Sequence, residues 1–276
     1  MTTGIQELLD KQNQTFWNEL CGSHLAKKLG VTDRSIESLK KFDNGFFTSY
    51  PYLHSIIPFQ EMRGKKVLEI GLGYGTVGQT IMEAGADYSG LDIAKGPCEM
   101  MQHRARMNGF SADVKTDSVL EAPFADESFD YIVSIGCFHH TGNMQQAVNE
   151  THRMLRKGGT AIIMVYNQFS GRQWNRWPKA CLQALLHQSG LKKAAPISST
   201  LQKGAYDANT EKQAAPEVEF FSYTTLKHIF AGYPSIRLRR ENMDRLRWLG
   251  LRVSRKLLCK TVARWIGLDI YLTAVK

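Results

Sequence analysis

Three glycines separated by single residues follow an acidic side chain in this 276-residue sequence. Glu69 precedes the run, and Gly71, Gly73 and Gly75 form it. A glycine backbone can approach a ligand closely and adopt positive φ, which a side chain would hinder. The run therefore predicts a turn that cradles a nucleotide-like cofactor.

Two further acidic residues stand at the ends of predicted strands. Asp92 lies roughly 20 residues beyond the first glycine, and its carboxylate can accept hydrogen bonds from both hydroxyls of a ribose. Asp117, with Ser118 beside it, is placed to accept from the exocyclic amine of an adenine. We include Ile93, next to Asp92, in the same predicted cofactor site.

The spacing of the glycines separates two kinds of cofactor. Dinucleotide sites use G-x-G-x-x-G, whereas here Thr76 occupies the place of the third dinucleotide glycine. Glu69 adds negative charge where a pyrophosphate would be repelled and where a cationic amino or sulfonium group is tolerated. Methyl transfer therefore fits better than hydride transfer.

Strands and helices alternate around these residues. Such alternation predicts a parallel sheet with helices on both faces and with its ligand site at the carboxyl ends of the strands. Predicted strands cover residues 66–70, 88–93, 112–116, 129–135, 160–166, 235–240 and 268–275. Predicted helices follow the glycines and cover 97–108, 145–155, 180–187 and 224–230.

Changes in composition and hydrophobic pattern divide the chain into four parts. Residues 1–60 are an N-terminal helical and aromatic cap, and 61–170 are the cofactor-binding core. Residues 171–220 are an insertion over the substrate, within which 192–216 look like a mobile loop or lid. Residues 221–276 complete the sheet and carry a basic segment.

The motifs together resemble the class I (Rossmann-like) S-adenosylmethionine-dependent methyltransferases. The resemblance rests on V-L-E-I-G-x-G-x-G, L-D-I, T-D-S, F-D-x-I-V-S-I-G-C-F-H-H-T and M-L-R-K-G-G-T-A-I-I, over about residues 60–170. It implies S-adenosylmethionine as cofactor and a seven-stranded, mostly parallel sheet whose last strand is antiparallel.

The resemblance also implies roles for individual residues. Glu69 and the glycines would line the methionine moiety, Asp92 would hold the ribose, and Asp117 would meet the adenine. Ser134, Ile135 and Gly136 would close on the cofactor through their backbone.

Paired histidines follow the fourth predicted strand, where the methyl group should point. An imidazole titrates near pH ~6.5 and can take a proton from a phenol, carboxylic acid or amine. His140 is our first candidate for a general base and His139 the second. The alternative is that both histidines cap the next turn and shape the pocket.

Aromatic residues in the flanking segments are candidates for the substrate site. They could enclose an apolar acceptor and exclude water, or pack the cap against the sheet. These candidates are Phe16, Trp17, Tyr50, Tyr52, Tyr166, Trp174 and Trp177, with Asn167 as a further pocket residue.

Composition sets broader limits. The hydrophobic content of 43% and charged content of 22% are ordinary for a globular protein. The five cysteines are dispersed without metal or disulfide spacing, which predicts reduced thiols, no metal site and a cytoplasmic location.

The net charge of +9 is concentrated near the C-terminus, with ten Lys and Arg between Arg237 and Arg264. Leu251, Leu258, Val262 and Trp265 would share one face of a helix there. The segment could dock on a membrane surface or bind nucleic acid, or it could pack on the sheet with its charges in solvent.

The sequence supports three functional hypotheses. We favour a methyltransferase that modifies an O or N atom of a small molecule, in specialised metabolism. A methyltransferase for RNA or protein would use the basic segment. A non-enzymatic S-adenosylmethionine-binding protein or a nicotinamide oxidoreductase is the third reading.

Overall fold

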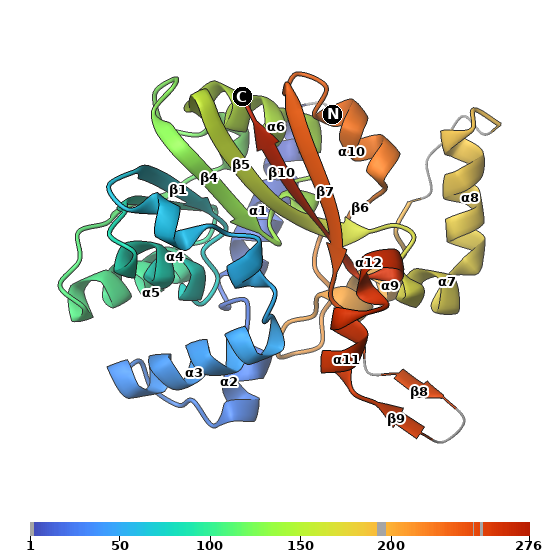
Figure 1. Cartoon of the computed structure of the whole chain (residues 1–276), viewed down its shortest axis with the longest axis horizontal. Coiled ribbons are helices and arrows are strands. Elements are labelled where there is room, and N and C mark those ends of the chain that lie inside the picture. The colour runs from blue at the N-terminus through green and yellow to red at the C-terminus, as the bar shows by residue number, and fades with distance from the viewer. Residues whose placement is uncertain (1–2, 192–196, 245, 249–250) are drawn as a thin grey trace.

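The computed structural model describes residues 3–191, 197–244, 246–248 and 251–276. An eight-stranded sheet forms its centre (Figure 1). The strands are β1 (Lys66–Ile70), β2 (Asp87–Asp92), β3 (Asp113–Thr116), β4 (Phe129–Ile135), β5 (Leu155–Asn167), β6 (Phe220–Phe221), β7 (Ser235–Glu241) and β10 (Asp269–Val275). Their order is β3-β2-β1-β4-β5-β10-β7, and β6 pairs with the end of β5. The predicted α/β class is confirmed, and β6, only two residues long, is the strand beyond the predicted seven.

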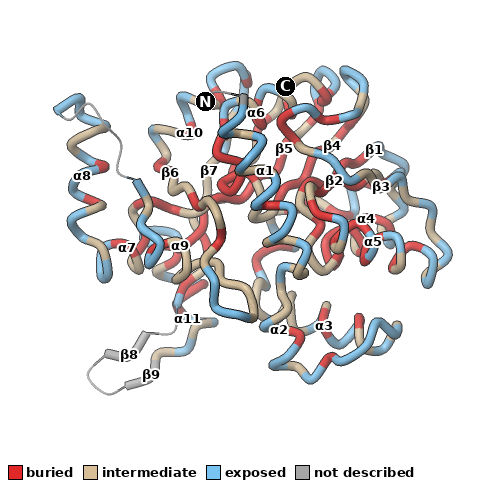
Figure 2. The backbone as a smooth tube through the Cα atoms, turned by 180° about the vertical axis from the view of Figure 1, so that it is seen from behind, coloured by how far each residue is buried: buried red, intermediate tan, exposed pale blue. Residues whose placement is uncertain are grey.

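Alternating side chains divide the core between the two faces of the sheet. In β1, Leu68 and Ile70 belong to one buried cluster and Val67 to the other. In β4, Ile132 and Val133 divide in the same way. Successive side chains of a strand point to opposite faces, so a central strand with apolar residues on both faces needs a cover on both sides. Figure 2 shows the buried residues concentrated in this sheet.

Helices supply both covers. On one face lie α4 (Thr76–Glu83), α5 (Lys95–Met107) and the short 3-10 helices η1 (Leu53–Ser55) and η2 (Phe59–Met62). On the other face lie α6 (Met144–Met154), α10 (Tyr223–Ile229) and η3 (Val119–Glu121), with η4 (Phe138–His140) directly after β4.

The last strand runs antiparallel, as predicted. β10 lies between β5 and β7 and is antiparallel to both. Its register places Asp269 opposite Tyr166 of β5. The start of β10 therefore meets the carboxyl end of β5, where the predicted site lies.

The N-terminal cap comprises α1 (Thr3–Trp17), α2 (Ser23–Leu29) and α3 (Ile36–Ser49). A buried ion pair joins it to the core: both oxygens of Asp43 accept from the guanidinium of Arg104, each at 2.9 Å. The same guanidinium donates from Nε to the carbonyl of Tyr74 in the glycine turn, at 2.8 Å. Asp43 thus fixes the cap over the turn.

The insertion after β5 is more regular than the sequence indicates. It contains α7 (Gly171–Arg176), α8 (Pro178–Gln188) and α9 (Thr200–Tyr206). The predicted loop over 192–216 is therefore wrong for the part that α9 occupies, whereas a lid over the substrate stays a prediction. Ser199 explains α9, because Ser199 and Gln202 form a reciprocal cap at its N-terminus. Residues 192–196 lie outside the described part.

The C-terminal basic segment is not a single helix. It forms a hairpin of β8 (Leu246–Trp248) and β9 (Leu251–Val253), followed by α11 (Arg255–Lys260) and α12 (Ala263–Ile266). Leu251 lies in a strand, so the predicted common helical face is wrong. Of the later residues, Leu258 is buried and Trp265 is exposed. In the described part of the chain, no helix has the length and apolar character needed to cross a membrane.

We expect Asp43→Ala to destabilise the protein by about 3 kcal/mol, because it leaves the guanidinium of Arg104 buried without a counter-charge. Urea denaturation would measure this loss. Asp126→Ala is the matched control, because its pair with Arg153 is exposed and should contribute no more than about 1 kcal/mol. Equal losses in the two variants would show that the buried pair does not hold the cap.

Candidate active site

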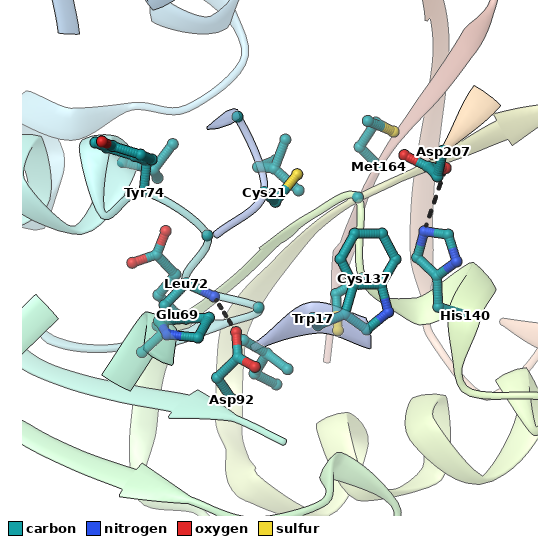
Figure 3. A pocket seen from close by; sticks show the side chains of 18 of the residues that line it. Trp17, Cys21, Glu69, Leu72, Tyr74, Asp92, Cys137, His140, Met164 and Asp207 are labelled. Atoms are coloured by element: carbon teal, nitrogen blue, oxygen red, sulfur yellow. Dashed lines mark hydrogen bonds and ion pairs between the residues drawn. The ribbon is translucent and has the colours of Figure 1, made fainter. Parts of the chain in front are cut away.

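A cavity of about 380 Å³ opens at the carboxyl ends of β1, β2, β4 and β5. The cap and the start of β10 complete its wall: Trp17 of α1 and Phe46 of α3 line it, as does Asp269. Figure 3 shows side chains from the cap (Trp17), the core (Asp92) and the insertion (Asp207) around the same space. The predicted ligand edge of the sheet is therefore a formed cavity.

The glycine turn forms one end of the cavity. Gly71, Gly73 and Gly75 all have positive φ, at 82°, 51° and 79°. A Cβ on Gly71 would lie 2.5 Å from the Cβ of Cys137, so the close approach of the turn to the loop after β4 requires glycine there. Gly75 is also the N-cap residue that precedes α4.

Asp92 orders this turn. Its Oδ2 accepts from the backbone N–H of Leu72 at 2.8 Å, and its Oδ1 accepts from that of Ala94 at 2.9 Å. Burial raises the pKa of Asp92 to about 6, while these backbone donors oppose the rise. Each carboxylate oxygen has acceptor capacity left for a ribose hydroxyl.

Glu69 lies beneath the turn and is 3% exposed. The hydroxyl of Tyr88 donates to its Oε2 at 2.6 Å. Burial raises the pKa of Glu69 to about 8. An approaching cationic group would favour the ionised form of this carboxyl.

The residues predicted to contact the adenine also line the cavity. Ile93, Asp117 and Ser118 line the cavity, and Asp117 is exposed. The Oδ1 of Asp117 accepts from the backbone N–H of Ser118 at 2.7 Å, which orients the carboxylate.

The opposite end contains His140. Its Nδ1 lies 2.6 Å from the carbonyl of Glu217, and because a carbonyl only accepts, we assign the Nδ1 proton to the neutral ring. Nε2 then carries a lone pair, and it lies 3.6 Å from Oδ2 of Asp207. Burial lowers the pKa of His140, and the charge of Asp207 partly offsets this.

Two carboxylates that the sequence analysis missed lie at this end. Asp207 follows α9 and accepts a hydrogen bond from the hydroxyl of Tyr166 at 2.8 Å. Asp269 is 1% exposed: its Oδ2 accepts from Asn242, whereas its Oδ1 has no partner among the described atoms. Burial raises the pKa of both, that of Asp269 to about 7.

Most of the predicted site residues meet in this cavity, and some do not. Those that line it are Glu69, Gly71, Gly73, Gly75, Asp92, Ile93, Asp117, Ser118, Gly136, His140, Trp17, Tyr50 and Tyr166. Ser134, His139, Phe16, Tyr52, Trp174 and Trp177 do not line it. Trp174 is 41% exposed on α7, and His139 is completely buried behind His140. Asn167 is also buried and bonds to the carbonyl of Gly267.

Other cavity residues had no recognisable motif. Arg172, Tyr206, Asp207, Asn242 and Asp269 come from the insertion and the C-terminal part. The one available signal was the position of Asp269 at the start of a predicted strand. His139, His140 and Asp207 also offer ligand atoms within 4.8 Å of one another, which could hold a metal ion, so the predicted absence of a metal site stays a prediction.

Comparison with known proteins agrees with this geometry. Residues 68–163 match the model of a family described as a methyltransferase domain. This part of the chain is therefore a methyltransferase domain, which agrees with the resemblance to the class I S-adenosylmethionine-dependent methyltransferases. The resemblance noted in the sequence is thereby confirmed.

Two curated relatives illustrate how far the similarity extends. The ubiquinone biosynthesis O-methyltransferase of Klebsiella pneumoniae is 26% identical over 165 residues, which cover 59% of this chain and 62% of that protein. Methyltransferase GfsG of Streptomyces halstedii is 32% identical over 103 residues, covering 36% and 37%. The chain therefore matches about three-fifths of the length of the first relative and less of the second.

A solved structure shows the same fold. A SAM-dependent methyltransferase of Thermotoga maritima superposes with a TM-score of 0.51 at 15% identity, covering 90% of this chain and 99% of the other. At this identity the likeness concerns the fold alone.

We expect Asp92→Ala to weaken S-adenosylhomocysteine binding by at least about 100-fold, because two hydrogen bonds to a charged acceptor are lost. Calorimetry would measure this, with Asp113→Ala on the exposed start of β3 as the control. An Asp92→Ala protein that binds like the wild type would contradict the assigned ribose site.

Proposed function

We propose that this chain transfers a methyl group from S-adenosylmethionine to an O or N atom of a small-molecule acceptor. The observation that carries the proposal is one cavity with two chemically distinct ends. Asp92 beside the glycine turn suits a ribose, and His140 with Asp207 suits the removal of a proton. The cavity thus offers a place for a cofactor and for an acceptor next to it.

The residues present fit S-adenosylmethionine. Asp92 would hold the ribose hydroxyls, Asp117 the adenine amine, and the glycine turn with Glu69 the methionine part. When bound, the cofactor supplies an electrophilic methyl group on a sulfonium. A cationic ligand beside Glu69 would favour the ionised form of this buried carboxyl, whereas a pyrophosphate would keep it protonated, and this favours a sulfonium cofactor over a nicotinamide cofactor.

The acceptor end supports a small molecule with an aromatic or apolar body. Trp17, Tyr50 and Tyr166 line the cavity, so they would contact the acceptor and exclude water. The name of one relative, a ubiquinone biosynthesis O-methyltransferase, favours such an acceptor. The remaining aromatic candidates would affect acceptor binding only indirectly, because they lie outside the cavity wall. They are Phe16, Tyr52, Trp174 and Trp177.

We propose that His140 takes up the proton that the methyl acceptor loses. Its neutral ring has a lone pair on Nε2, and it lies after β4 at the acceptor end of the cavity. His139 packs against this ring, with centroids 4.2 Å apart, and would position it.

The second candidate is a methyltransferase for RNA or protein that uses the basic C-terminal segment. Several of its charges have partners inside the protein. Arg239 and Arg264 both pair with Glu241, and Arg255 bonds to the Met243 carbonyl and to Asn242. Arg240 stacks over Tyr223. These contacts weaken the case for a nucleic-acid surface and for membrane docking. The cytoplasmic location stays a prediction.

Calorimetry and turnover together test this function. We expect S-adenosylhomocysteine to bind with micromolar affinity or better, and NAD and NADP not to bind. With S-adenosylmethionine and a panel of phenols, carboxylic acids and amines, we expect S-adenosylhomocysteine to form with at least one acceptor class.

Preferential binding of NAD would contradict the cofactor assignment. Cofactor binding without turnover on the panel, together with RNA affinity that falls steeply with salt, would favour the second candidate.

A further inference from the structure

The imidazole of His140 is enclosed by protein. It is 5% exposed, and its Nδ1 is committed to the Glu217 carbonyl. The ring of Trp17 lies with its centroid 4.6 Å away, and that of His139 4.2 Å away. Nε2 is the ring nitrogen left without a hydrogen-bond partner, and it faces Asp207 (Figure 3). The approach to this lone pair therefore leads past Asp207.

His140 and Asp207 face each other with two hydrogen-bond acceptors and no proton between them. A neutral His140 presents a lone pair at Nε2, and an ionised Asp207 presents another at Oδ2, 3.6 Å away. Two acceptors that face each other are stable only when a donor lies between them or when one of them takes up a proton. The pair is thus an acceptor for a single proton.

Asp207 is the more open member of the pair. Its side chain is 15% exposed and lines the cavity, against 6% for the side chain of His140. The hydroxyl of Tyr166 donates to the same Oδ2 and orients the carboxylate. Asp207 therefore reaches the space that an acceptor would occupy.

Nearby charged groups leave this carboxylate without a cationic partner. Arg172 lines the cavity, but Nε and Nη2 of its guanidinium bond to the two oxygens of Asp244, at 2.7 and 2.6 Å. Lys203 pairs with Glu217 at 3.0 Å. Asp269, the other carboxyl at this end, supplies no positive charge. No arginine or lysine ion pair of Asp207 occurs among the described residues. Its lone pairs therefore remain available for the O–H or N–H of the molecule to be methylated.

We propose that Asp207 is a catalytic residue that contacts the acceptor's hydroxyl or amine and passes its proton to His140. The proposal rests on the methyl-transfer function above and makes it more specific, because the acceptor must carry an O–H or N–H at the reacting atom.

The acceptor's O or N forms a bond to the methyl carbon, while the carbon–sulfur bond breaks and leaves its electron pair on sulfur. The acceptor's proton moves to the carboxylate of Asp207 and from there to Nε2 of His140. The imidazolium formed is then paired with the ionised Asp207.

A double-mutant cycle tests the relay, with the acceptor that the turnover panel identifies. We expect Asp207→Asn and His140→Gln each to lower kcat on the order of 100-fold, since each removes general-base catalysis. The double variant should be no slower than Asp207→Asn alone, because residues that act as one unit are not additive. S-adenosylhomocysteine affinity should stay unchanged, and so should the kcat of the control Asp126→Asn.

Three kinetic outcomes would overturn the proposal. One is a rise in KM without a fall in kcat in Asp207→Asn. Another is a double variant whose loss is the product of the single losses. The third is activity that chelation abolishes and a divalent metal restores, because Asp207 would then hold an ion.

A measurement on the protein without a methyl acceptor tests the relay independently of methyl transfer. Nitrogen NMR of the protein alone should show Nδ1 protonated and Nε2 unprotonated in neutral His140. The pKa of His140 should fall in Asp207→Asn and stay constant in Asp126→Asn, because the carboxylate charge favours the imidazolium. An unchanged pKa would sink the relay even if methyl transfer occurs. Absence of cofactor binding with an intact shift would sink the methyl-transfer function instead.

Discussion

Four of the carboxylates that line the cavity accept hydrogen bonds mainly from neutral donors of the fold. Glu69 accepts from Tyr88, Asp92 from two backbone N–H groups, Asp207 from Tyr166, and Asp269 from Asn242. Among the described residues none of the four has an ion pair with lysine or arginine. Burying a carboxylate in this way is costly, and the cost appears as a raised pKa at each of them.

This constraint accounts for much of the surrounding architecture. Hydroxyl donors and cationic groups of a ligand can satisfy the remaining lone pairs of these carboxylates. A ribose and a sulfonium would provide such groups, and so would the O–H or N–H of the molecule to be methylated. The glycine turn must approach Cys137 closely to form one wall. The pair of Asp43 and Arg104 holds the cap and the turn together, so that α1 and α3 complete the enclosure. In the proposed function, Asp92 at one end would serve the cofactor and Asp207 at the other would serve the methyl acceptor.

The part of the site that local sequence determines could be predicted from sequence. Gly71, Gly73 and Gly75 precede a helix, and Asp92 ends the neighbouring strand, so a strand–turn–helix unit and its partner strand suffice to place them. β10 was predictable because the resemblance to a known family specified an antiparallel last strand. The bounds of β7 and α8 also agree closely with the predicted ones.

The acceptor end depends on contacts between distant segments. Asp207 belongs to a segment of polar composition whose helix α9 is specified by one capping box, and only the folded chain brings it to Tyr166 and His140. The paired histidines cannot be told apart in the sequence. The 3-10 turn of η4 directs His140 to the cavity and buries His139. Trp174 looked like a pocket residue because of its type, yet α7 leaves it partly exposed outside the cavity.

A crystal structure with S-adenosylhomocysteine bound tests the central claim most directly. We predict that both ribose hydroxyls donate to Asp92, that the adenine lies beside Asp117, and that the sulfur faces the space next to Asp207 and His140. A ligand whose ribose lies away from Asp92, or whose sulfur points away from Asp207, would contradict the account.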